Sequence, residues 1–308
     1  MTKKYQKTFL FLLLLLICSA LSAQRALYVD NFNSILGNND KEDKLLYFAQ
    51  DNGFTTLILY ELHLVRKRLP MNNYKKISIL SDFITLAKTK YNVKKVVASG
   101  ENSEIFLNYL HVYNETRKDD IERFNSYNIE YEFWHKTNSD LGGYYCENYL
   151  RKNKIPCTSE GSFNYFKETI SVLDFIRKET NYPLGIEVYL ANFDKKQILA
   201  LKKYNIKYRI SAYASNVELS SKEIKKELKI LSNCKCIKEV SIILSSEPFF
   251  MSGHLKYNSL EKTEKEFENY ISKYKNIHFT EFTYFKYSDL KKSIGFRKLR
   301  RTGIKPKY

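Results

Sequence analysis

The sequence predicts an α/β fold, a single closed (β/α)8 barrel of the TIM type that follows an N-terminal signal peptide. Strand-like runs alternate with amphipathic, helix-like runs along nearly the whole chain after residue 23. Eight strand-like runs fit a barrel in which each parallel strand is followed by a helix or a loop. The alternative, an open doubly wound sheet, usually has a glycine-rich phosphate turn after its first strand, and the stretch DNFNSILGNND lacks one.

The first 23 residues have the order of a secretory signal peptide. Three lysines precede an apolar run over residues 9–17, and small residues end the segment at Ala23. The apolar run is short for a membrane span, and no later segment is long and apolar enough to cross a bilayer. We expect cleavage after Ala23 and a secreted or periplasmic protein, which could also associate with the cell surface. An uncleaved N-terminal anchor is the alternative.

The expected barrel occupies residues 24–295, and a basic tail occupies residues 296–308. In order along the chain, the expected strands are residues 25–30, 55–61, 93–99, 128–134, 184–191, 208–213, 239–246 and 277–285. The helix-like segment between the first two expected strands ends at Gly53, a helix stop signal. Near residue 220, Ser220 or Ser221 is expected to cap a helix. The longest irregular segment, residues 135–160, follows the fourth strand and should overhang the carboxyl-terminal mouth of the barrel.

The bulk composition excludes some classes of function. Hydrophobic residues make up 44% of the chain, enough for a sizeable core, and the formal net charge is +17. The lysines are spread along the chain, so the basic stripe expected of a nucleic-acid-binding protein is absent. A basic surface that faces anionic glycans or lipid headgroups is compatible with this charge. No histidine stands at metal-ligand spacing to the cysteines, and we expect neither a metal nor a cofactor.

The cysteines agree with an oxidising compartment. Once the signal peptide is removed, the even set of Cys146, Cys157, Cys234 and Cys236 remains. A disulfide between Cys146 and Cys157 would staple the irregular segment after the fourth strand. Free buried thiols are the alternative.

Acidic residues stand at inward-facing positions of several expected strands. Neighbouring side chains on a strand face opposite sides, so Glu130, Glu132 and Trp134 should face the barrel axis. Glu247 follows the seventh strand at its carboxyl end. The same alternation turns further side chains inward, namely Asp30, Glu187, Tyr189, Arg209 and Tyr213. In the eighth strand, Glu281 and Tyr284 have opposite parity, so one of them faces away unless a bulge intervenes.

Such a polar axis has a structural and a functional interpretation, because the interior of these barrels is normally filled with branched apolar residues. Glu130 and Glu187 lie deeper and could pair with Arg209 in a buried network. Glu132 and Glu247 lie nearer the mouth, where (β/α)8 enzymes carry out their chemistry.

Acids at the ends of strands four and seven resemble the pattern of the (β/α)8 glycoside hydrolases. The resemblance implies that Glu132 is the general acid/base and Glu247 the nucleophile. It covers the barrel pattern from about residue 25 to 290; the sequence departs from the family in having Tyr131, where asparagine often precedes the acid/base. In general style the chain also resembles exported barrels of Bacteroidetes type.

The chemistry that this resemblance implies needs one protonated and one ionised carboxyl group facing a sugar. Trp134, the only tryptophan, could stack on a sugar ring, and Tyr189, Tyr213 and Tyr284 could donate hydrogen bonds to hydroxyl groups. The inward residues Asp30, Glu187 and Arg209 are further candidates for substrate contact. Each of these residues also has an interpretation as ordinary packing.

Two other enzyme classes and a binding protein compete with this interpretation. A metal-dependent phosphodiesterase would need histidine clusters at strand ends, and only His135 and His254 fall near the expected mouth. A serine hydrolase would need a G-x-S-x-G elbow, which does not occur. The stronger rival is a non-catalytic barrel that binds a glycan or a peptide at its mouth, or serves as a surface scaffold.

Overall fold

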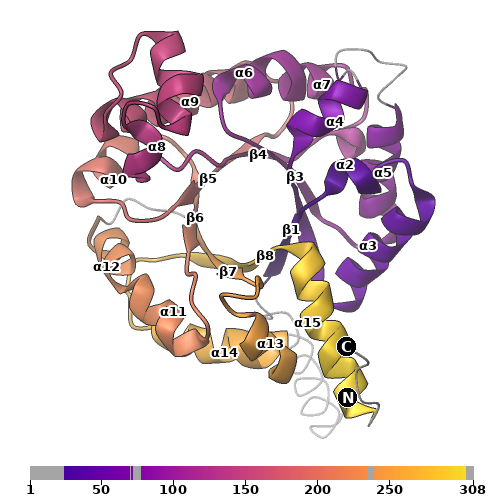
Figure 1. The fold of residues 1–308 in the computed structure, drawn as a ribbon. Helices are drawn as coiled ribbons and strands as arrows, with labels where there is room; N and C mark the ends of the chain where they lie inside the picture. The colour runs from indigo at the N-terminus through magenta and orange to yellow at the C-terminus, as the bar shows by residue number, and fades with distance from the viewer. Residues whose placement is uncertain (1–23, 70, 72–77, 235–238, 303–308) are drawn as a thin grey trace, which may run out of the picture.

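The computed structural model describes residues 24–69, 71, 78–234 and 239–302, and it closes parallel strands into a barrel (Figure 1). Strand β1 pairs in parallel with both β2 and β8, so the sheet has no free edge. In the described residues the strands are β1 (Gln24–Val29), β2 (Phe54–Leu59), β3 (Lys95–Gly100), β4 (Ser126–Ile129), β5 (Gly185–Leu190), β6 (Lys207–Ser211), β7 (Glu239–Ser245) and β8 (Phe279–Phe285). The predicted fold class is confirmed. The expected signal peptide and the last six residues lie outside the described residues.

Helices surround the strands (Figure 1). The longer ones are α3 (Asn39–Asp51), α5 (Ser78–Lys90), α9 (Ser159–Glu179), α12 (Lys225–Cys234), α14 (Leu260–Ile271) and α15 (Tyr287–Arg301). Shorter helical segments are α2 (Phe32–Ile35), α4 (Leu62–Arg68), α6 (Ser103–Ile105), η1 (Phe106–His111), α7 (Val112–Glu115), η2 (Asp120–Glu122), α8 (Lys136–Ser139), η3 (Cys146–Leu150), η4 (Arg151–Asn153), α10 (Lys195–Leu201), α11 (Val217–Glu223) and α13 (Ser252–Tyr257). Helix α15 continues past residue 295, so the expected basic tail begins inside a helix.

Side-chain caps set where several helices begin. The Asn38 side chain accepts a hydrogen bond from the Lys41 backbone N–H at the start of α3. Asn216 caps α11 in the same way, by accepting from the backbone N–H of Leu219. The expected cap at Ser220 or Ser221 is therefore wrong, because both serines lie inside the helix that Asn216 starts.

The alternation along each strand divides the apolar side chains into two cores. The larger core lies between the strands and the helices, and it includes Ile129 at the end of β4 and Tyr131 and Phe133 just after it. The smaller core fills the middle of the barrel and consists of Ala26, Tyr28, Ile58, Val97, Tyr189 and Ile243. Tyr284 belongs to the larger core, and its hydroxyl donates to Glu264 of α14 at 3.0 Å. The expected ligand contact of Tyr284 is therefore corrected, since this side chain faces the helices.

An ionic layer crosses the barrel on the amino-terminal side of the small core. Arg209 is fully buried, and its Nη2 lies 2.5 Å from Glu187 Oε2 and 2.8 Å from Glu281 Oε1. Lys207 Nζ lies 2.5 Å from the same Glu281 oxygen. Glu187 and Arg209 thus pair with each other inside the barrel and do not face the mouth. Their expected contact with substrate is therefore wrong, and the alternative expectation of a buried network is the one that matches.

The fourth strand is shorter than expected, and this places its acids at the mouth. Its last ladder hydrogen bond runs from the Glu130 backbone N–H to the Gly100 carbonyl at 2.9 Å. The chain then turns, and the His135 backbone N–H donates to the Glu132 carbonyl at 3.0 Å. Glu130 and Glu132 therefore lie just beyond the carboxyl end of β4 rather than within it.

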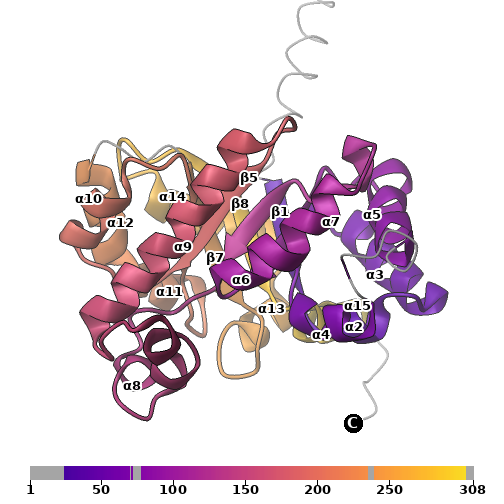
Figure 2. The same ribbon diagram turned by 90° about the horizontal axis from the view of Figure 1, so that it is seen from above.

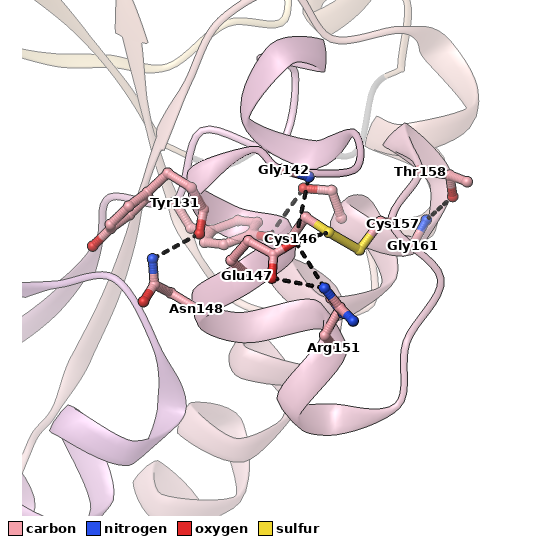
Figure 3. The surroundings of a disulfide bond; sticks show 11 residues. Tyr131, Gly142, Cys146, Glu147, Asn148, Arg151, Cys157, Thr158 and Gly161 are labelled. Carbon is pink, nitrogen blue, oxygen red and sulfur yellow. Dashed lines mark hydrogen bonds and ion pairs between the residues drawn. A yellow bond between two sulfur atoms is a disulfide. The ribbon is translucent and has the colours of Figure 1, made fainter.

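A disulfide braces the irregular segment that follows. Cys146 of η3 is bonded to Cys157, just before α9, which is the pairing considered from the sequence (Figure 3). Next to it, Glu147 accepts from the backbone N–H of Gly142 and pairs with Arg151 (Figure 3). Figure 2 shows α8 at the same end of the barrel as α13, where the loops that follow the strands gather.

Candidate functional site at the barrel mouth

A cavity of about 240 Å³ lies at the carboxyl ends of the strands. Three carboxyl groups and six aromatic rings line it, and none of its lining residues is a lysine or an arginine. The lining residues are Tyr28, Tyr60, Glu101, Glu130, Glu132, Tyr145, Tyr189, Tyr213 and Phe285. The acids of this cavity therefore lack a cationic partner among the residues that enclose it.

Glu130 lies at the base of the cavity, above a buried amide. Asn128 Nδ2 reaches Tyr28 Oη at 3.1 Å, Ser99 Oγ at 3.2 Å and Glu130 Oε1 at 3.4 Å. Burial raises the pKa of Glu130 to about 8, against the opposing effect of a hydrogen bond from Tyr28. The nearby Glu132 and Glu101 carboxylates raise this pKa further. Glu130 is therefore mostly protonated at neutral pH.

Glu132 lines the cavity, and its side chain is 32% exposed. Burial raises its pKa, while His135 and a hydrogen bond with Tyr189 act in the opposite direction. His135 Nε2 lies 3.0 Å from Glu132 Oε2. The backbone N–H of Glu132 donates to Tyr145 Oη at 3.1 Å, which fixes the local chain. Burial thus raises the pKa of Glu132, which has the Tyr189 hydroxyl and the His135 ring beside it.

Glu101 is a site residue that the sequence analysis missed. It directly follows β3, and its Oε2 accepts hydrogen bonds from Tyr149 at 2.5 Å and from Tyr144 at 3.1 Å. Both tyrosines belong to the disulfide-braced segment. Its position directly after a parallel strand was the available signal, because the carboxyl ends of such strands meet at one mouth.

Two further cavities adjoin the central one. A larger one, of about 490 Å³, shares Tyr60, Glu101 and Glu130 with it and extends beside α4. A smaller one, of about 180 Å³, contains Trp134 and shares Tyr189 and Tyr213 with the central cavity. Three of the predicted sugar-contact residues, Trp134, Tyr189 and Tyr213, therefore lie next to one another, and the Trp134 and Tyr189 ring centroids are 5.3 Å apart.

Glu247 is held outside this cavity. Ser245 Oγ donates to Glu247 Oε2 at 3.0 Å, and Lys286 Nζ lies 3.4 Å from its other oxygen. Glu247 is not among the residues that line the central cavity with Glu132. The structure thus does not bring the expected pair of Glu132 and Glu247 together in one opening.

Asp30 also has a structural partner. It is buried and accepts hydrogen bonds from the backbone N–H of Ser288 at 2.9 Å and from the Ser288 hydroxyl at 2.6 Å. These bonds hold the first turn of α15 against the end of β1. The expected role of Asp30 in substrate contact is therefore replaced by one in closing the barrel.

Among the described residues, no group of three or more His, Cys, Asp and Glu side chains could hold a metal ion. The described helices include none with the length and apolarity needed to cross a membrane.

Comparisons with known proteins add only distant similarities. No protein-family model matches the sequence. No curated protein matches it either.

Solved structures with a similar chain course include concanavalin B, with 11% identity, a TM-score of 0.47, and coverage of 90% of this chain and 96% of that one. A 2,3-dimethylmalate lyase, described as a PEP mutase/isocitrate lyase superfamily member, has 11% identity and a TM-score of 0.45 over 92% of this chain and 84% of that one. Dihydropteroate synthase from Stenotrophomonas maltophilia has 6% identity and a TM-score of 0.41 over 93% and 95%. Similarities this low carry no argument about function.

Proposed function

We propose that the protein is a glycoside hydrolase that acts in the cavity shared by Glu101, Glu130 and Glu132. The observation that carries the proposal is this set of carboxyl groups, enclosed by aromatic rings and without a lysine or arginine in the lining. Such surroundings keep one acid protonated at neutral pH, which is what a general acid for glycosidic cleavage requires. Tyrosines at the rim offer both flat faces and hydroxyl donors to a sugar.

In this proposal, Glu132 gives its proton to the glycosidic oxygen as the bond to the sugar carbon breaks. The resulting carboxylate then takes a proton from the water that adds to that carbon, which restores the starting state. His135, 3.0 Å away, holds the Glu132 side chain in place.

The second acid in the proposal is Glu101 rather than Glu247. Glu101 accepts two phenolic hydrogen bonds at one oxygen, and these bonds orient its carboxyl group in the cavity. A carboxylate in the same cavity would stabilise the positive charge that develops on the sugar as the bond breaks. Glu130 remains beneath both as a protonated acid.

Export belongs to the same proposal. The disulfide between Cys146 and Cys157 favours an oxidising compartment, as does the N-terminal pattern of lysines followed by an apolar run.

The test compares three isosteric variants, Glu132→Gln, Glu101→Gln and Glu247→Gln, against a panel of aryl glycosides and polysaccharides. We expect Glu132→Gln and Glu101→Gln to lose turnover by at least about 100-fold, the usual scale for removing an acid catalyst. Glu247→Gln is the matched control and should keep most of the activity.

Two results would overturn the proposal. Unchanged turnover in Glu132→Gln would show that Glu132 is not the general acid. A loss of turnover in Glu247→Gln alone would assign the reaction to Glu247 instead. Glycan binding by the parent chain without any turnover would support the rival, a non-catalytic binding barrel.

A further inference from the structure

The three mouth cavities adjoin in a row, with Glu132 near the middle. The central cavity shares wall residues with the large cavity beside α4 on one side and with the Trp134 cavity on the other. Tyr189 and Tyr213 form the common wall between the central cavity and the Trp134 cavity. A ligand longer than one ring therefore has room on both sides of the proposed acid.

The Trp134 cavity has the composition of a pocket for a polar ring. Trp134, Tyr189 and Tyr213 supply flat faces, and Asn192 and Ser211 supply side-chain amide and hydroxyl groups. The pocket lies against Glu132, because His135 lines it and pairs with the Glu132 carboxylate at 3.0 Å. A ring bound here would therefore be next to the one that Glu132 protonates.

Glu227 of α12 gives this pocket an unmet acceptor. The residue is 6% exposed and lines the pocket, and its Oε2 has no hydrogen-bond partner among the described residues. A buried acceptor without a donor is costly, so a bound group that donates a hydrogen bond would be favoured there. Glu223 lines the same pocket, and no lysine or arginine does. Two acids without a cation in the lining disfavour an anionic group.

We propose that the Trp134 pocket is a sugar subsite for a ring that carries hydroxyl or amino donors and no anionic group. The substrate is then an oligosaccharide whose ring in this pocket is neutral or amino-bearing, and which lies across Glu132 and is cut inside the chain. This inference rests on the proposed glycan function of the mouth and specifies the substrate class for that same site.

The test measures calorimetric binding of three defined oligosaccharide series, each from two to six rings. The series are cello-oligosaccharides, which are neutral, glucosamine oligomers, which carry amines, and oligogalacturonides, which carry carboxylates. The binding measurements use the Glu132→Gln chain, so that hydrolysis does not interfere. We expect the affinity for a neutral or amino series to rise with ring number, and the oligogalacturonides to bind more weakly.

Substitutions in the pocket then assign that rise to Trp134 and Glu227. Trp134→Ala should lower the affinity for six-ring oligomers about tenfold and leave the two-ring oligomers nearly unchanged. Glu227→Gln keeps the shape of the pocket and should lower the same long-oligomer affinity, which keeps the test decisive if Trp134→Ala does not fold. Phe175→Ala, at an exposed aromatic on α9, is the matched control.

Three outcomes would overturn the inference. They are no binding by any series, strongest binding by the oligogalacturonides, or the same dependence of affinity on ring number in the Glu132→Gln chain with and without either pocket substitution. Failure of the proposed hydrolysis is read separately, from the products of the parent chain. Length-dependent binding that requires Trp134, with no products formed, would leave the subsite intact and remove the enzyme. Internal cleavage products together with that binding would support both.

Discussion

The barrel holds buried acids at two levels, and the pKa of Glu281 at one level and that of Glu130 at the other shift in opposite directions. In the ionic layer, Arg209 and Lys207 lower the pKa of Glu281 to about 2, although burial alone would raise it. At the mouth, no lysine or arginine lines the cavity, and burial raises the pKa of Glu130 to about 8. Both residues point into the same barrel. Inward orientation alone therefore does not decide what an acid does; the nearest cation does.

The largest effect should follow from removing the cation of the ionic layer. Arg209→Met leaves Glu187 and Glu281 buried without their shared partner, and we expect a loss of about 3–5 kcal/mol in the free energy of unfolding. Urea denaturation at pH 7 measures this loss. The control, Arg151→Met, breaks the exposed pair with Glu147 and should cost less than about 1 kcal/mol. Equal losses in the two variants would contradict the contrast between the levels.

The variant Glu130→Gln should show a pH-dependent difference in stability from the parent chain, because it removes the titrating acid at the mouth. The folded pKa of about 8 lies above the value of about 4.3 expected for an unfolded glutamate. The stabilising effect of the Glu130 proton is thus complete in acid and is lost as the pH rises through 8. Glu130→Gln cannot lose it, so the variant should gain stability relative to the parent between pH 5 and pH 9. Urea denaturation at both pH values is the measurement, and a difference that does not vary with pH would argue against a neutral Glu130.

The smallest effect is expected outside both levels, at Tyr284. Tyr284→Phe removes one hydrogen bond to Glu264, which keeps its bond to Arg25 at 2.6 Å. We expect a loss of about 1 kcal/mol in unfolding free energy and no change in glycan binding. Tyr189→Phe, at the mouth, is the comparison and should change glycan binding. An altered ligand affinity in Tyr284→Phe would mean that this side chain reaches the mouth after all.

The fold could be predicted from the sequence because each barrel strand is a short apolar run that can be recognised without knowledge of its neighbours. The alternation along the strands also predicted that Glu187, Arg209 and Tyr189 face the interior of the barrel. The side of a strand on which a residue lies can be inferred from a few neighbouring residues. The end of β4 was misplaced because Glu130 to Trp134 keeps a strand-like alternation after the ladder has stopped. Where ladder hydrogen bonds end depends on the neighbouring strand, which the local pattern does not contain.

Which residues line the central cavity was harder to predict from the sequence, because this depends on the path of each loop. Glu101 and Glu247 both follow a strand closely, yet only Glu101 lines the central cavity. After β7 the chain turns sharply, with the Met251 backbone N–H donating to the Ser245 carbonyl at 2.9 Å, and Lys286 holds Glu247 at that turn. The partners of Glu101, Tyr144 and Tyr149, come from the disulfide-braced segment more than forty residues along the chain.

The joining of β1 to β8 bears on how the chain is made. Residues 24–29 find their second neighbouring strand only once residues 279–285 exist, and Asp30 meets its partner Ser288 later still. During synthesis, one edge of β1 therefore stays unpaired until β8 has been made. An unpaired strand edge can form hydrogen bonds with another chain and so lead to aggregation. A chain that ends before residue 279 would leave one edge of β1 and one edge of β7 unpaired, and we expect such a truncated chain to aggregate.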